Sequence, residues 1–85
     1  MGLPDETIFK GYSIHLENND EYLVSYKIDS GEKSLAWSKF PEIAKCFQSL
    51  NKAENTKAKI RPEATIMWLF DTGTNIVATQ PKDYN

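Results

Sequence analysis

The residues best suited to covalent chemistry are the only histidine, His15, and the only cysteine, Cys46. A thiolate and an imidazole act together as nucleophile and base when their side chains are in contact. Cys46, however, falls on the apolar side of a segment with helical spacing, where a buried thiol behaves as a small inert hydrophobic group. The sequence therefore predicts a core cysteine without a catalytic role.

Acidic side chains gather near His15, which raises the question of a metal site. Glu17, Asp20 and Glu21 follow it in a stretch that also contains two asparagines, but their spacing matches no known set of metal ligands. The chain also lacks the glycine-rich motifs that bind nucleotides or present a catalytic serine. We expect a solvated acidic turn here, with no metal ligand, no cofactor and no catalytic residue.

One short stretch, Leu69 to Asn75, resembles the active-site segment of aspartic proteases, in which an apolar strand delivers the aspartate of a D-[ST]-G motif. The resemblance implies that Asp71 is a catalytic acid, paired with Asp29 or with Asp71 of a second copy. The residues around Asp29 depart from the family's pattern, and only 12 residues follow Gly73, too few for that family's flap and closing strands. We therefore interpret Asp71 as a turn residue and expect no enzymatic activity.

A helix is predicted from the segment 37–52, with its end expected between residues 51 and 55. Its apolar residues recur at the spacing of one helical face: Ile43, Cys46, Phe47 and Leu50. Pro41 is tolerated only in the first turn of a helix, and Ser38 is the nearest side chain able to cap the free amides. The helix is therefore expected to begin between Ser38 and Pro41.

Strand patterns lie on both sides of this segment. Apolar and polar residues alternate before it, and turn-forming residues separate the alternating runs, as in antiparallel hairpins. Residues 65–70 are apolar without alternation, which favours an interior strand covered on both faces. Residues 57–62 are expected to form a basic connector with room for one short strand. The main strands are predicted over 8–17, 22–28, 35–37, 65–70 and 76–80.

These elements predict an α+β fold, in which an antiparallel sheet of about five strands, in the order β-β-β-α-β-β, carries one helix on one face. At 85 residues the chain is the size of one domain, 1–85, with loose ends expected at 1–6 and 81–85. Its longest apolar run is five residues, Ile66 to Phe70, where a membrane helix needs about 20. A single cysteine is typical of a cytoplasmic rather than a secreted small domain, so we expect no membrane association and a cytoplasmic location.

Charge is distributed unevenly along the chain. Residues 1–32 hold seven acidic residues and two lysines, a net charge of −5, whereas residues 33–62 hold seven basic and two acidic residues, a net charge of +5. Such asymmetry is typical either of a binding surface or of internal charge balance.

Without catalytic or cofactor motifs, the sequence favours binding. We expect a non-catalytic domain that binds another protein, including a second copy of itself, in the class of small inhibitors, immunity proteins or accessory regulatory proteins. Ten aromatic residues exceed what so small a core can hide, and the expected partner-binding residues are Trp37, Phe40 and Tyr26. The alternative is nucleic-acid binding through the basic segment 52–61, by Lys52, Lys57, Lys59 and Arg61. Against it stand a pI near 5.3 and a single arginine.

Overall fold

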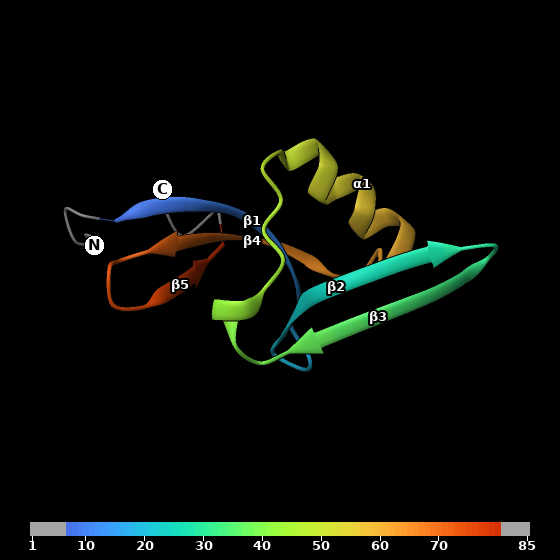
Figure 1. Ribbon diagram of the computed structural model, residues 1–85, viewed down its shortest axis with the longest axis horizontal. Coiled ribbons are helices and arrows are strands. Elements are labelled where there is room, and N and C mark those ends of the chain that lie inside the picture. Colours follow the sequence, from blue (N-terminus) through green and yellow to red (C-terminus); the bar gives the residue numbers. More distant parts are fainter. Residues whose placement is uncertain (1–6, 81–85) are drawn as a thin grey trace.

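The protein is an antiparallel five-stranded sheet with one α-helix, seen in a computed structural model that describes residues 7–80 (Figure 1). The expected loose ends, 1–6 and 81–85, lie outside these residues. The strand order across the sheet is β3-β2-β1-β4-β5, so the predicted α+β class with a single helix is confirmed. In chain order the elements are β1 (Ile8–Leu16), β2 (Glu21–Asp29), β3 (Glu32–Ser38), the 3₁₀ turn η1 (Pro41–Ile43), α1 (Leu50–Ile60), β4 (Thr65–Asp71) and β5 (Ile76–Thr79).

The strands follow the patterns read from the sequence. β1 is the middle strand, and its residues 13–15 are buried on both faces of the sheet. β4 pairs with β1 on one side and β5 on the other, and Ile66, Met67 and Leu69 are all buried. The continuous apolar run at 65–70 is therefore an interior strand, as expected.

The predicted helix over 37–52 is wrong. Pro41 opens only the single 3₁₀ turn η1, and Ala44 after it is already extended. Phe47 then exchanges two backbone hydrogen bonds with Tyr12 of β1, at N···O distances of 2.7 and 2.8 Å, and the Lys45 amide donates to the carbonyl of Leu23 in β2 at 2.8 Å. These backbone bonds to the sheet replace the intrahelical ones, so residues 44–48, hereafter the crossing segment, stay extended.

The actual helix begins one residue after Ser49, whose hydroxyl accepts the amide of Lys52 at 3.4 Å as an N-cap. Its buried residues, Ala53, Thr56 and Ile60, recur at i, i+3 and i+7. Two of these are small or polar, which is why the helical face was hard to see among apolar residues. Residues 57–60 of the expected basic connector form the last turn of this helix.

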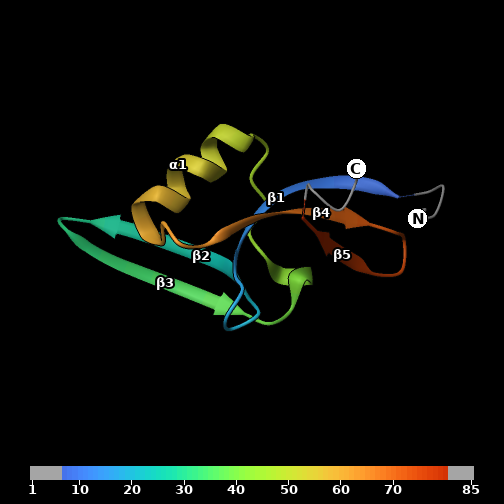
Figure 2. The ribbon, with the colours of Figure 1, turned by 180° about the vertical axis from the view of Figure 1, so that it is seen from behind.

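The crossing segment fills a gap in the sheet. β1 and β2 pair only near their shared turn, at His15 with Tyr22 and at Leu16 with Glu21. Beyond that point the strands part, and the crossing segment bonds to β1 at Tyr12 and to β2 at Leu23. Figures 1 and 2 show it running from η1 past the middle of the sheet to α1, which lies above the strands in these views.

One glycine permits this close approach. Gly11 has φ 143°, a left-handed conformation that side chains rarely adopt, and a Cβ atom there would lie 2.7 Å from the carbonyl oxygen of Phe47. Phe47 is thereby held in the core, which lies between α1 and the middle of the sheet. That core consists of Ile14, Leu23, Phe47, Ala53, Ile60, Ala64 and Ile66.

Candidate functional site

The structure does not join His15 to Cys46. His15 is buried on β1, where its Nε2 lies 3.0 Å from Asp20 Oδ1 and its ring lies against that of Tyr22 at 4.6 Å. Cys46 is half-buried in the crossing segment. The sequence had suggested a position on a helix, so this expectation is wrong. Burial raises the pKa of the Cys46 thiol more strongly than the nearby Lys10 and Lys45 lower it. A thiol in this state is a weak nucleophile at neutral pH.

The two aspartates of the protease-like turns also lie apart. Asp71 ends β4 and its Oδ1 accepts the amide of Gly73 at 2.8 Å, which is the turn hydrogen bond expected for it. Asp29 ends β2, and the β2–β3 and β4–β5 turns occupy opposite ends of the molecule (Figure 1). The two carboxylates therefore cannot share a proton within one chain, and their intramolecular pairing is wrong.

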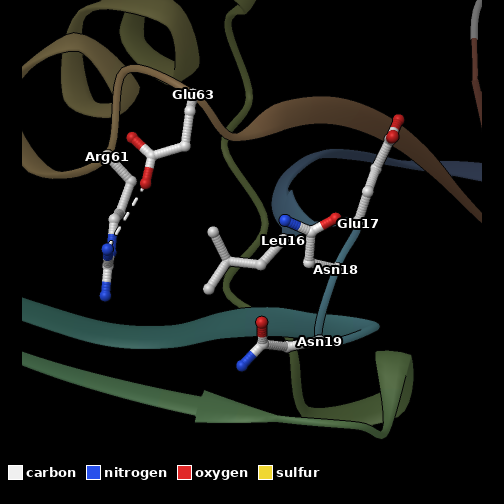
Figure 3. A pocket seen from close by; sticks show the side chains of 6 residues that line it. All are labelled: Leu16, Glu17, Asn18, Asn19, Arg61 and Glu63. Atoms are coloured by element: carbon white, nitrogen blue, oxygen red, sulfur yellow. Dashed lines mark hydrogen bonds and ion pairs between the residues drawn. The ribbon is translucent and has the colours of Figure 1, made fainter.

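Of the acidic residues near His15, Glu17 borders a polar pocket of about 340 Å³ at the β1–β2 turn (Figure 3). Arg61 and Glu63 form an ion pair at 3.3 Å on one side of it, and Glu17 lies across from them. Glu17 Oε1 accepts hydrogen bonds from Thr65 and Gln80, at 3.3 and 3.1 Å. Within residues 7–80 no three His, Cys, Asp or Glu side chains are grouped as metal ligands would be.

The basic residues of segment 52–61 are divided between different surroundings. Lys57 donates to the carbonyl of Pro62 at 2.8 Å, and Arg61 is paired with Glu63. Lys52 and Lys59 instead line a groove between α1, the crossing segment and β2. The four residues do not form the single basic row that the sequence suggested.

The three expected partner-binding residues have three different environments. Trp37 is half-buried and packs against the core, while Tyr26 is half-buried and lines the groove just described. Phe40 precedes η1 and is 66% exposed. Of the three, Phe40 is the one with a largely exposed ring.

A cluster that the sequence did not reveal lies on β1 and β4, hereafter the aromatic surface. Its rings line a shallow apolar hollow of about 290 Å³ and contact one another edge-on or tilted, with centroids 5.2 to 6.5 Å apart. Such geometry is favourable for aromatic pairs. The surface consists of Phe9, Tyr12, Trp68 and Phe70.

A β-bulge creates this cluster. Phe9 and Tyr12 are three residues apart, so simple alternation would place them on opposite faces of β1. The register shift between Phe9 and Gly11 pairs Phe9 with Phe70 and Tyr12 with Trp68, which are two residues apart on β4. All four rings therefore share one face, and the glycine at position 11 was the only sequence signal for the bulge.

The aromatic surface continues the face that α1 covers. Tyr12 pairs with Trp68 across the two strands, and Ile14 pairs with Ile66 two residues farther along. Ile14 and Ile66 belong to the core beneath the helix. An 11-residue helix is about 16 Å long, whereas the molecule extends 45 Å. Among residues 7–80, α1 therefore covers the inner half of this face and does not extend over the outer half of β1 and β4 (Figure 1).

No protein-family model, curated protein or solved structure matches this chain. Within residues 7–80, no helix has the length and apolar character needed to cross a membrane.

Proposed function

We propose that this chain is a non-catalytic protein-binding domain, of the class of small inhibitors, immunity proteins or accessory regulatory proteins. The observation that carries the proposal is the aromatic surface, with Phe9 44% exposed at its edge. Aromatic side chains are enriched among the residues that dominate binding energy in protein interfaces. An apolar cluster with an exposed edge is typical of an interaction surface.

The chemistry of the hollow specifies the partner. Four rings line it, so the contact area is almost entirely apolar. A partner protein that inserts one or two apolar side chains fits such a hollow, because shape and burial, not charge, contribute the binding energy there. We assign the domain to the cytoplasm, where an unpaired cysteine such as Cys46 stays reduced.

The proposal is tested by affinity capture with a matched pair of variants. Phe9→Ser removes one ring of the aromatic surface, and Phe40→Ser removes a more exposed ring outside it. Both variants change the same residue type, and both side chains are exposed enough for the fold to tolerate the change. We expect the unmodified chain and Phe40→Ser to retain the same partner from a lysate of the source organism, and Phe9→Ser to lose it.

The opposite pattern would move the binding surface to the η1 region around Phe40 and Ile43, which is 56% exposed. If both variants retain the partner, neither Phe9 nor Phe40 contributes substantially to binding. Light scattering of the purified chain identifies the remaining case, in which the occupant is a second copy of the chain. A dimer that Phe9→Ser dissociates would make this protein its own partner.

A further inference from the structure

A second surface, distinct from the aromatic surface, combines positive charge with aromatic rings. The groove between α1, the crossing segment and β2 has a volume of about 530 Å³, and no acidic side chain lines it. We refer to it as the basic groove. The residues that define its chemistry are Lys45, Lys52, Lys59, Tyr26, Phe47 and Asn55.

Its three lysines have exposed side chains, and among residues 7–80 none of them takes part in a salt bridge. A fourth, Lys33, lies beside Lys59, because its Nζ donates to the Lys59 carbonyl at 3.1 Å. Uncompensated ammonium groups around a recess attract anions, because the recess concentrates their field. The basic groove is therefore an anion-binding surface even though the whole chain carries a net charge of −2.

The spacing of the lysines favours a chain of anionic groups. Lys52 and Lys59 are seven residues apart on α1, which is about two turns or 10 Å along the helix axis. At that spacing each lysine can contact a separate phosphate of a polymer with repeated phosphates. Lysine binds phosphate as a flexible point charge, so such contacts are independent of base sequence.

The rings distinguish a nucleic acid from an acidic peptide. Tyr26 is half-buried and stacks on Phe47, with centroids 6.3 Å apart and ring planes 23° apart. Lys45 Nζ lies over both rings, at 5.8 and 5.6 Å from their centroids. A phosphate that draws this ammonium group aside would leave the Tyr26 ring open to an unpaired base, and bases stack on aromatic side chains irrespective of sequence.

We propose that the basic groove binds single-stranded nucleic acid, with phosphates on Lys45, Lys52 and Lys59 and a base on Tyr26. The proposal goes beyond the protein-binding function and is independent of it, because the basic groove and the aromatic surface share no lining residue.

Fluorescence anisotropy with a labelled 12-nucleotide oligothymidylate tests the phosphate contacts. Three contacts give a salt slope of about −2 for a single strand, so affinity should fall about 20-fold between 50 and 200 mM salt. The triple variant K45Q/K52Q/K59Q should abolish this dependence. The control K39Q/K57Q/R61Q removes the same charge outside the basic groove, where these side chains contact Asn19, Pro62 and Glu63. It should bind within about threefold of the unmodified chain.

If both triple variants lose the same affinity for the oligomer, binding depends on overall charge alone. That result would overturn the proposed site. Absence of binding at 50 mM salt with about 100 μM protein would overturn it as well, since non-specific nucleic-acid binding reaches that range at higher salt.

Two further ligands test the ring contact without altering the protein. An abasic oligomer of the same length keeps the phosphates and lacks the bases, and it should bind at least about fivefold more weakly if one base stacks on Tyr26. Polyglutamate of matched charge should compete poorly. Equal affinity for the abasic oligomer, or effective competition by polyglutamate, would contradict the nucleic-acid assignment and make the groove a site for acidic protein segments.

Cys46 supplies a footprint that does not depend on any variant folding, because it also lines the basic groove and is the only thiol in the chain. Saturating oligothymidylate should slow labelling of Cys46 by a maleimide reagent several-fold relative to the free protein. Labelling at an unchanged rate in the saturated complex would place the ligand elsewhere.

Discussion

Gly11 allows the crossing segment to pair with β1. It forms the bulge that brings Phe9 and Tyr12 to one face, and its missing side chain leaves room for the backbone of Phe47. A single position therefore affects both the aromatic surface and the core. Glycine in a strand interior commonly marks such a close approach of two backbones.

Replacing Gly11 with alanine should lower the free energy of unfolding by roughly 2–4 kcal/mol, because the φ of 143° is strained for alanine and its Cβ would clash with a backbone oxygen. Gly73→Ala is the control, since Gly73 has φ 95° but open space around it. Strain alone should cost that variant about 1–2 kcal/mol. Equal costs for the two variants in urea unfolding would show that the contact with Phe47 is unimportant.

Tyr22 predicts a loss of stability at alkaline pH. Burial raises the pKa of its hydroxyl above the ordinary value of 10.0, and the carboxylates of Asp20 and Glu42 raise it further. Above pH 10 the unfolded chain loses the proton of the Tyr22 hydroxyl, whereas the folded chain retains it because its pKa is higher. The contribution to stability is therefore complete below pH 10 and falls as pH rises toward the folded-state pKa.

In Tyr22→Phe this part of the alkaline decline should disappear, while any contribution from Cys46, whose thiol pKa is also raised, remains in both proteins. Urea unfolding at several pH values between 8 and about 11 measures the difference. Parallel stability curves for the two proteins would contradict the assignment to Tyr22.

At the level of elements, the strands could be predicted and the helix could not. Alternation of apolar and polar residues is a local property, so β1, β2 and β3 were visible in the sequence. The apolar spacing over 43–50 also fits a helix. Phe47, however, is held in the core by backbone hydrogen bonds to Tyr12, which lies 35 positions earlier in the chain. No local pattern reports such a contact.

The candidate sites follow the same division. Phe40 is exposed and Tyr26 lines a groove, so these two predicted residues lie at the surface, but in different environments. The aromatic surface depends on the register of β1 against β4 and on the bulge, and the basic groove depends on where α1 begins. Both are long-range consequences of the fold.

Ser49 offers a test of the revised helix boundary. Ser49→Ala removes the N-cap acceptor of α1 and should lower the free energy of unfolding by about 1 kcal/mol. Ser38, the cap expected from the sequence, accepts only the amide of Phe40 before η1, so Ser38→Ala should cost about 0.5 kcal/mol or less. Chemical denaturation of the two variants compares them, and a larger cost at Ser38 would favour the original boundary.

The whole molecule is a long, thin sheet with one helix on one face. It extends 45 Å in one direction and 24 Å in each of the others, and its single helix covers only part of one face. The aromatic surface lies on β1 and β4 beyond the end of α1, while α1 and the crossing segment bring together lysines from the +5 portion of the chain. We therefore propose two different binding chemistries at two places on one small domain.

The central claim is that the aromatic surface is buried by a protein partner, and tryptophan fluorescence tests it most directly. The chain has two tryptophans, Trp37 beside the core and Trp68 in the aromatic surface, so Trp37→Phe leaves Trp68 as the sole reporter. With the captured partner prepared free of tryptophan and bound at saturation, acrylamide quenching of Trp68 should fall to roughly half its value in the free domain or lower, because interface centres exclude water. Quenching of Trp68 that is the same in the free and bound domain would contradict the account.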